Sequence, residues 1–154
     1  MNSESENLTG RIATAADFAQ LAEMNRQLIR DEGHRNAMSA LELEHRMKNW
    51  LAGEYQAAIF LLDEATVGYA LYKHEQEWTY LRQFFIVPAK RRQGLGSAAL
   101  NWLIQNHWRS SCRIRLDVLT GNAGAIQFWK SAGFQDYCIT MELAMLPSFG
   151  QNEQ

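Results

Sequence analysis

The stretch from Tyr80 to His107 constrains the fold more strongly than any other part of the chain. It begins with an aromatic and β-branched run that Pro88 ends, which predicts a strand, because proline cannot donate a hydrogen bond to a sheet. A basic turn with two glycines follows, and from Ser97 apolar residues recur at spacings of three and four, which predicts a helix. A glycine turn at a helix N-terminus gathers N–H groups where the helix dipole is positive. We therefore expect a phosphorylated cofactor to bind at this turn.

The first half of the chain predicts one short strand and two amphipathic helices. The strand is expected at residues 11–13, and the first helix at residues 17–29, where apolar residues form a helical stripe. Ser39 and Glu42 have the spacing of a capping box, which places the start of the second helix there. Gly53 is expected to end this helix, because glycine is a common C-terminal cap.

The second half of the chain is dominated by strand patterns. Two apolar runs, at residues 57–62 and 66–72, are separated by an Asp-Glu turn and predict an antiparallel hairpin. After the central stretch, residues 113–119 alternate as in a strand, residues 123–131 predict a short helix, and residues 134–143 predict one or two final strands. This order of elements indicates a mixed α/β sheet with helices on its faces.

Length and composition fit a single globular domain. We expect it to span residues 11–146, between a flexible N-terminus at 1–10 and a C-terminal tail at 147–154. A hydrophobic share of 47% argues against disorder, and a net charge of -2 gives no reason to expect nucleic acid or a membrane as a partner. A cytoplasmic location is the expectation. Cys112 and Cys138 fall in apolar runs and are expected to be buried, reduced thiols.

Two motifs carry the most specific signal. The first is Arg91-x-x-Gly94-x-Gly96, between the strand and the helix of the central stretch. The second, about 30 residues further on, is Asn122-x-x-Ala125-x-x-Phe128-Trp129-x-x-x-Gly133-Phe134. The turn differs from a Walker loop, since no Gly-Lys-Ser/Thr follows, and from the dinucleotide fingerprint, since the third glycine is missing. Together the two motifs resemble the GNAT superfamily of acyl-CoA-dependent N-acyltransferases, and the element order extends this resemblance from Arg11 over nearly the entire chain.

The resemblance implies an α/β fold with a mixed, mostly antiparallel central sheet of six to seven strands and helices on both faces. The sheet is splayed at the end of the fourth strand, and the pantetheine arm of the cosubstrate, acetyl-CoA, inserts there. The residues that the resemblance assigns to the cofactor are Phe85, Ile86, Val87, Arg91, Arg92, Gln93, Gly94, Leu95, Gly96, Ser97, Asn122, Phe128 and Trp129. Any single basic side chain of the turn fits a solvated surface residue equally well. The sequence has no Cys/His cluster at metal-ligand spacing, so no metal is expected.

The implied reaction is transfer of an acetyl group to a primary amine of a small molecule or a protein, by direct attack in a ternary complex. The backbone N–H of Val87 would then polarise the thioester carbonyl. Many relatives place a tyrosine general acid directly after the Phe of the second motif. This chain has Trp129 there, and an indole cannot supply a proton at a useful pKa. Tyr137 and Cys138 are the substitutes that the sequence offers, and a CoA-binding sensor without transferase activity is the alternative function.

The general base is expected at the start of the long strand. Glu77 is the first candidate, with Glu75 and His74 beside it, although solvated turn residues fit the same pattern. The acceptor amine has no readable code in the sequence. An edge strand near the C-terminus offers a surface for pairing in a homodimer.

Overall fold

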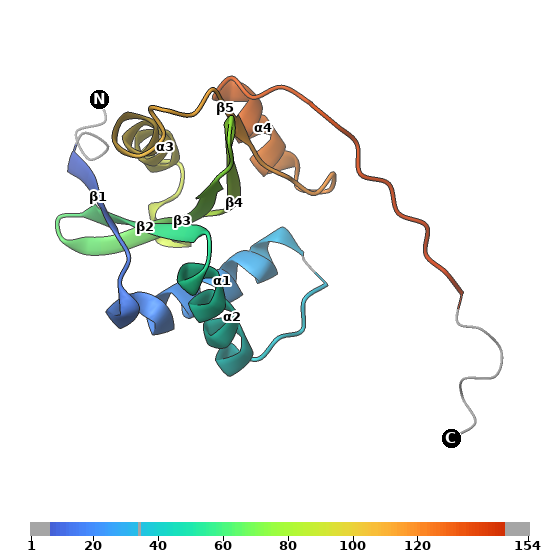
Figure 1. The fold of residues 1–154 in the computed structure, drawn as a ribbon, viewed down its shortest axis with the longest axis horizontal. Coiled ribbons are helices and arrows are strands. Elements are labelled where there is room, and N and C mark those ends of the chain that lie inside the picture. Colours follow the sequence, from blue (N-terminus) through green and yellow to red (C-terminus); the bar gives the residue numbers. More distant parts are fainter. Residues whose placement is uncertain (1–6, 34, 147–154) are drawn as a thin grey trace.

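The computed structural model describes residues 7–33 and 35–146, and it has one sheet with helices on both faces (Figure 1). The strands are Leu8–Ile12 (β1), Tyr55–Leu62 (β2), Ala65–His74 (β3), Trp78–Ile86 (β4) and Arg113–Arg115 (β5). The helices are Phe18–Glu32 (α1), Ala40–Ala52 (α2), Leu95–Asn106 (α3) and Ala123–Ser131 (α4). Two short 3-10 helices, at Ala15–Asp17 and Pro88–Lys90, precede α1 and follow β4.

The five strands lie in chain order across the sheet. The pairs from β1 to β4 are antiparallel, whereas β5 runs parallel to β4. The predicted hairpin is confirmed as β2 and β3. Its turn places Asp63 and Glu64 at positive φ, 50° and 68°, which suits the twist of a two-residue hairpin loop.

The pairing of β4 with its two neighbours is unequal. On one side β4 pairs with β3 over most of its length, from Thr79 to Ile86. On the other side only Trp78–Tyr80 pair, with Arg113–Arg115 of β5. The predicted splay is therefore present: among the described residues, β4 has no strand partner on this side from Leu81 onward.

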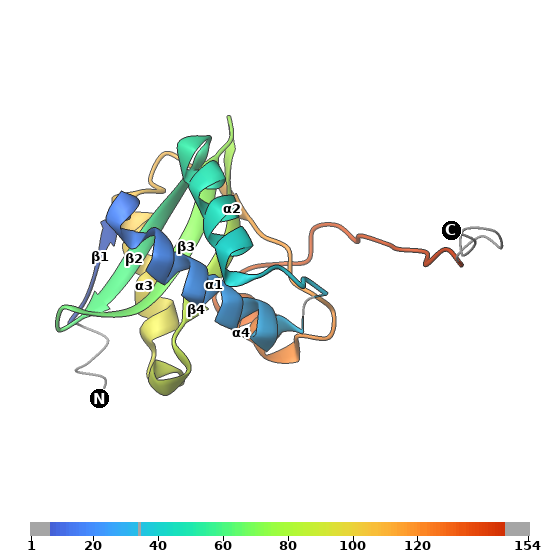
Figure 2. The same ribbon diagram turned by 90° about the horizontal axis from the view of Figure 1, so that it is seen from below.

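The helices divide between the two faces of the sheet (Figures 1 and 2). Helices α1 and α2 pack on one face, where the largest buried side chains are Leu21, Met47, Tyr69, Leu71 and Phe85. Helix α3 packs on the other face, where the largest are Phe60, Tyr72, Leu95, Leu103 and Trp108. The predicted start of α2 is confirmed, with Ser39 as its N-cap: the Ser39 hydroxyl accepts from the Glu42 N–H at 3.2 Å. The Glu42 carboxylate accepts from the same hydroxyl at 3.1 Å.

Four expectations from the sequence differ from the structure. The strand expected at residues 113–119 is limited to Arg113–Arg115 (β5), because the chain beyond it has no strand partner among the described residues. Six to seven strands are not confirmed: the described residues form five, and residues 134–143 join no strand pair. Their alternating pattern predicts a strand, but a strand also needs a partner for its backbone groups, and the pattern does not supply one. Residues 8–10, expected to be flexible, belong to β1, while residues 1–6 and the predicted tail at 147–154 lie outside the described residues. Cys112 and Cys138 are free but exposed, not buried, because one precedes an edge strand and the other lies beyond α4.

None of the described helices is both long and apolar enough to cross a membrane.

A buried carboxylate joins β1 to the start of α1. Asp17 is 6% exposed and accepts two hydrogen bonds from the Arg11 guanidinium, both at 2.8 Å, and one from the Thr14 N–H at 2.8 Å. The Arg11 hydrogen bond is the main cause that lowers the pKa of Asp17 from 3.8 to about 2, against an opposing effect of burial. Because the pKa is lower in the folded state, the ionised carboxylate stabilises the fold above pH 4, and this stabilisation is lost as the pH falls toward 2.

We predict that Asp17→Asn lowers the free energy of unfolding at pH 7 by about 2 kcal/mol. The deficit relative to the unchanged protein should shrink as the pH is lowered from 4 to 2, where the native carboxylate also becomes neutral. Urea denaturation at several pH values measures both effects. The exposed pair of Glu23 with Arg26 (3.2 Å) is the control, and Glu23→Gln should change stability by less than about 0.5 kcal/mol. A deficit of Asp17→Asn that stays constant down to pH 2 would contradict the assignment.

Candidate functional site

The main opening in the sheet is the gap between β4 and the chain that continues from β5, which we call the fork. Its closed end is the last β4–β5 pair, Tyr80 with Arg115. One branch is β4 from Leu81 to Ile86, and the other is the extended chain from Leu116. Backbone groups along the open β4 edge are therefore available to an inserted ligand.

The backbone groups of β4 that face the fork belong to Phe84 and Ile86. The N–H of Val87 donates to the Val67 carbonyl on β3 at 2.8 Å, so this group belongs to the β3–β4 ladder. Successive residues of a strand direct their backbone groups to opposite sides, which turns Ile86 toward the fork and Phe85 back toward β3. The free side of Ile86 is evident from its carbonyl, which accepts from the Arg91 Nε at 2.8 Å.

This geometry alters the assignment made from the sequence. Phe85 and Val87 were expected to offer backbone contacts, and Val87 to donate to the thioester carbonyl. In this structure the Val87 N–H is already engaged, and the groups facing the fork lie one residue earlier in each case. A pattern of apolar residues gives the strand but not the phase of its hydrogen bonds, so the sequence could not distinguish the two sets.

Arg91 is turned back toward the strand and toward α1. Besides its bond to the Ile86 carbonyl, its guanidinium donates to Asp31 in the last turn of α1 and lies 5.3 Å from the centre of the Phe85 ring. These contacts give the Arg91 side chain a structural role in holding the turn against the end of β4.

The glycine turn forms the predicted N–H cluster at the start of α3. Gly94 is the N-cap residue and adopts a left-handed conformation, φ 77°, as does Arg92 at 62°. The first helical bond runs from the Ala98 N–H to the Gly94 carbonyl at 3.1 Å. The N–H groups of the three residues from Leu95 to Ser97 therefore precede the helical ladder, and Gly94 has no side chain with which to cap them. This arrangement suits a phosphate oxygen.

The remaining predicted residues of the turn contribute in different ways. Gln93 directs its Nε2 to the Ala89 carbonyl at 3.4 Å, and Arg92 is exposed. Leu95 is buried and anchors the helix in the core, so only its backbone faces the turn.

The second motif lies on α4, which packs beside β4. The Asn122 side chain, which the resemblance assigned to the cofactor, accepts from the Ala125 N–H at 3.2 Å and caps the helix. Phe128 stacks on Phe84 of β4, with ring centres 6.1 Å apart. A Cβ at Gly96 would lie 3.2 Å from the Phe128 ring, so Gly96 allows α3 and α4 to approach closely, and this contact, not its φ, favours glycine here. The two motifs thus meet at this contact.

Trp129 belongs to the same aromatic cluster. Its ring meets Phe84 at 5.2 Å, Phe128 at 4.8 Å and Phe134 at 5.2 Å, each with the rings tilted steeply to one another. These contacts give Trp129 a packing role between α4 and the β4 branch of the fork.

The proton carriers expected from the sequence lie away from the open part of the fork. Glu77 precedes β4, beyond the closed end. Glu75 pairs with Lys73 at 3.1 Å, and the His74 Nδ1 contacts the Thr79 hydroxyl at 2.7 Å. Tyr137 is 75% exposed, and its hydroxyl accepts from Arg115 at 3.3 Å.

A pair of residues that the sequence did not single out stands at the closed end of the fork. The Tyr80 hydroxyl donates to the Asp117 carboxylate at 2.7 Å and so links the two branches where they start to diverge. Burial, followed by this hydrogen bond, raises the pKa of Tyr80 to about 12. The sequence signal for this pair was weak: the strand alternation placed Asp117 on the side opposite to Leu116 and Val118, but it did not indicate Tyr80 as its partner.

A chain of hydrogen bonds between polar side chains interrupts the apolar α1/α2 face beside the fork. Tyr69 donates to the Gln83 side chain at 2.8 Å, and Gln83 donates to the buried Asn25 at 2.9 Å. Further along this face, the guanidinium groups of Arg46 and Arg82 lie 4.4 Å and 4.8 Å from the Trp50 ring centre.

Arg46 carries positive charge into a half-buried position beside the exposed Arg82. Burial, and then the charge of Arg82, lower the pKa of Arg46. The Nε of Arg46 is buried without a hydrogen-bond partner, and neither guanidinium forms a salt bridge with a described carboxylate. The arrangement would accommodate an anionic group of a ligand.

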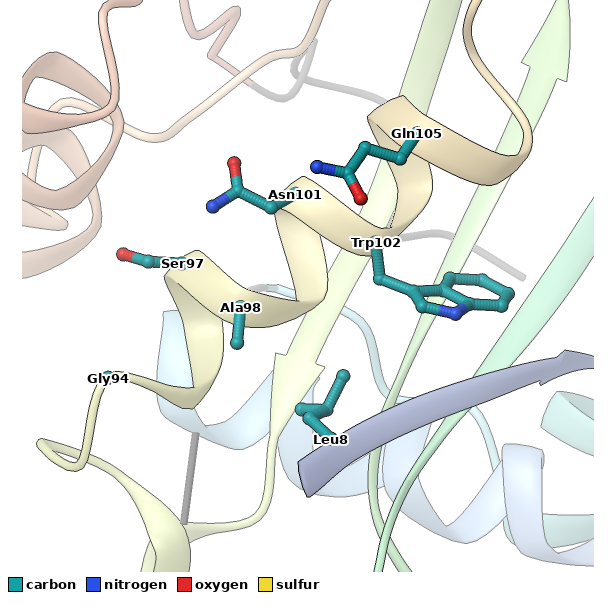
Figure 3. A pocket seen from close by; sticks show the side chains of 7 residues that line it. All are labelled: Leu8, Gly94, Ser97, Ala98, Asn101, Trp102 and Gln105. Carbon is teal, nitrogen blue, oxygen red and sulfur yellow. The ribbon is translucent and has the colours of Figure 1, made fainter. Parts of the chain in front are cut away.

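An open hollow of about 530 Å³ lies along α3 (Figure 3). It is lined by Leu8, Gly94, Ser97, Ala98, Asn101, Trp102 and Gln105. Its polar residues follow one side of the helix, starting at the glycine turn, and its apolar wall includes β1. The hollow therefore adjoins the anion site from the β1 side, whereas the fork reaches it from β4.

No group of three or more His, Cys, Asp or Glu side chains that suits a metal ion occurs in the described part of the chain.

Several solved structures with similar folds are named as acetyltransferases. A possible acetyltransferase from Clostridium difficile 630 superposes with a TM-score of 0.75 at 15% identity, over 92% of this chain and 99% of that one. The aminoglycoside N-acetyltransferase AAC(6')-Iy in complex with CoA gives 0.71 at 11% identity, over 90% and 94%. A predicted acetyltransferase with acetyl-CoA from Clostridium acetobutylicum gives 0.68 at 20% identity, over 89% and 96%.

A search of curated proteins found no match to the sequence. The family model described as the acetyltransferase (GNAT) family, however, matches residues 21–134, a range that holds most of α1, all of α2 to α4, the fork and both motifs. The chain therefore belongs to the GNAT acetyltransferase family.

Proposed function

We propose that this protein is a cytoplasmic N-acetyltransferase that moves the acetyl group of acetyl-CoA to a primary amine. The observation that carries the proposal is the alignment of two sites on one continuous stretch: the open β4 edge at Phe84 and Ile86 leads directly into the N–H cluster at Leu95–Ser97. A phosphate at the cluster and an extended amide-containing chain along the strand edge are the chemistry of CoA. Two of the similar structures hold CoA or acetyl-CoA.

In this proposal the residues of the turn bind the diphosphate of acetyl-CoA, and the residues of β4 orient its pantetheine arm. The N–H groups from Leu95 to Ser97 hold the diphosphate, and the Ile86 backbone pairs with the pantetheine arm after the Arg91 side chain leaves its carbonyl. The Phe84 N–H, which also faces the fork and lies deeper in it than Ile86, takes the place of the Val87 N–H as the donor nearest the thioester. The aromatic cluster of Phe84, Phe128 and Trp129 forms the wall that excludes water.

The reaction forms a bond between the amine nitrogen and the acetyl carbon, breaks the carbon–sulfur bond, and passes one proton from nitrogen to the leaving sulfur or to water. An alkylammonium ion has a pKa of about 10.4, so its neutral form costs about 4.6 kcal/mol at pH 7. We assign proton removal to Asp117, which Tyr80 holds at the closed end of the fork. Glu77, the candidate that the sequence suggested, lies outside this end.

The face that contains Arg46 and Arg82 favours an acceptor with a negative group in addition to its amine. Both guanidinium groups contact the Trp50 ring, and the charge of Arg82 lowers the pKa of Arg46, so an anion near both groups would relieve their mutual repulsion. This part of the proposal concerns the acceptor alone and leaves the donor site unchanged.

Two measurements on the purified chain test the proposal. Calorimetric titration with acetyl-CoA should give one site per chain, and thiol release should appear with some of a panel of primary amines, each offered with and without a carboxylate. Absence of binding would overturn the whole proposal. Binding without turnover on any amine would favour the alternative, a CoA-binding sensor. That alternative is suggested by Trp129, which stands where a tyrosine general acid was expected. Equal rates with both members of each amine pair would remove only the anionic acceptor.

We predict that Gly94→Val lowers the affinity for acetyl-CoA at least about tenfold, because a β-branched residue resists positive φ and moves the N–H groups of the turn. Gly33, at the C-terminus of α1, is the matched control, because its φ of 64° imposes the same strain and its Cβ would meet nothing within 4 Å. Gly33→Val should leave the affinity unchanged while lowering the melting temperature similarly. Equal loss of affinity in both variants would mean that strain, and not the turn, is responsible.

A further pair of variants separates the two candidate bases. Asp117→Asn should reduce kcat/KM by about 10²-fold or more with unchanged acetyl-CoA affinity, which is the usual contribution of a general base. Glu77→Gln, which removes a charge beyond the fork, should leave kcat/KM within about twofold. The reverse result would return the role of base to Glu77.

A further inference from the structure

The C-terminal residues 135–146, which we call the arm, belong to no strand or helix of this structure. They run as an extended chain from the end of α4 away from the body of the molecule (Figures 1 and 2). Large apolar side chains occupy every second position, which is the period of a strand with one apolar face. These side chains are 75% to 84% exposed: Tyr137, Ile139, Met141, Leu143 and Met145. A continuous apolar row of this kind marks a surface that another segment covers.

The end of the sheet nearest the arm is also incomplete. β5 is the last strand, and its one neighbour among the described strands is β4. The outer edge of β5 therefore presents N–H and C=O groups to which a further strand can add. Next to this edge, Val118 and Leu119 are 37% and 45% exposed. A hollow of about 390 Å³ opens between Leu119 and residues 33, 35 and 36 of the connection after α1.

We propose that two copies of the chain exchange their arms, so that the arm of each adds as a strand to the β5 edge of the other. Each copy has one uncovered arm and one uncovered edge. In a two-fold dimer each arm therefore pairs with the β5 edge of the other copy, and no arm or β5 edge remains unpaired. An extended arm of twelve residues reaches about 40 Å, which is enough to cross to a neighbouring molecule. The equal number of arms and edges favours a second copy over an unrelated protein.

Contacts within the chain direct the arm outward and not back along its own edge. The arm starts beside β5, where the Arg115 guanidinium lies 4.5 Å from the centre of the Tyr137 ring. It then passes the connection between α1 and α2, where Arg35 donates two hydrogen bonds to Glu142, at 2.9 Å and 2.8 Å. Both side chains of this pair are well exposed, so the contact orients the arm without fixing it.

The exchange also bears on the fork. Asp117 lies two residues beyond β5 and follows the edge that the partner's arm would occupy. The arm of the second copy would therefore lie behind the β5 branch of the fork, on the side away from β4, and the exchange would leave the β4 edge and the N–H cluster unchanged.

The first test uses the unmodified chain. Light scattering should give twice the mass of the 17.7 kDa chain. Hydrogen exchange should show slow amides in residues 135–146 that become fast when the protein is diluted into its monomeric range. A monomeric mass at all concentrations would overturn the proposal. So would protection of the arm that does not depend on concentration, since the arm would then pack on its own chain.

The second test changes one face of the arm. The triple variant Ile139→Glu, Met141→Glu and Leu143→Glu should raise the dimer dissociation constant at least about 100-fold, because it places charge on the face that the partner covers. Thr140→Glu adds charge to the opposite face and should leave the dimer in place. Unchanged calorimetric binding of acetyl-CoA confirms that the triple variant is folded. A dimer that persists in the triple variant would show that the interface lies elsewhere and overturn the exchange.

Discussion

The short pairing between β4 and β5 is the constraint on which the rest of the site depends. Parallel strands normally continue side by side, but here the ladder holds for three residue pairs and then stops. Beyond it, backbone groups of β4 that a neighbouring strand would have bonded are left for a ligand or for water. Such groups would be costly if they were buried without a partner, so whatever fills the fork must bond them, either as water or as a ligand with its own polar groups.

Several side chains fix the shape of the fork. Tyr80 and Asp117 join its two branches at the closed end, with a hydrogen bond of 2.7 Å. Further along, Phe128 and Trp129 of α4 stack against Phe84 and occupy the space behind β4. At the open end, Pro88 stops the strand, and the chain turns through Gly94 into α3. The strand edge and the helix N-terminus are therefore parts of one stretch, and their relative position follows from its local conformation.

This continuity explains how much of the site the sequence could predict. The strand, the glycine turn and the helix from Tyr80 to His107 are encoded locally, by proline, by glycine at positive φ and by helical periodicity, and they form as expected. The second motif is also local, yet the roles within it depend on contacts. Asn122 caps its helix, and Gly96 is favoured because Phe128 arrives from α4. Neither contact is visible from one segment alone.

The errors have the same origin. The phase of hydrogen bonding along β4 depends on its register with β3, which sequence spacing does not fix. For this reason Val87, and not Ile86, was predicted to direct its backbone groups into the fork. The Tyr80–Asp117 pair joins residues 37 positions apart and depends on the register of a strand of three residues. The final strands were expected from a correct alternating pattern, but the pattern carries no information about the chain with which they pair.

The replacement of the usual tyrosine by Trp129 follows a similar physical logic. A thiol has a pKa of about 8.5, so a thiolate released near pH 7 gains its proton from water or from the reacting ammonium without a dedicated acid. Tyr80, the tyrosine nearest the closed end, cannot serve as that acid: with a pKa of about 12, its transfer of a proton to the thiolate is unfavourable by roughly three orders of magnitude. Its hydroxyl is better suited to hold Asp117, to which the proposed reaction assigns the proton of the amine. In the proposed reaction the proton transfer with the larger free-energy cost is therefore the one from the amine. The position of Trp129 then needs no general acid and can hold a residue that packs against its neighbours.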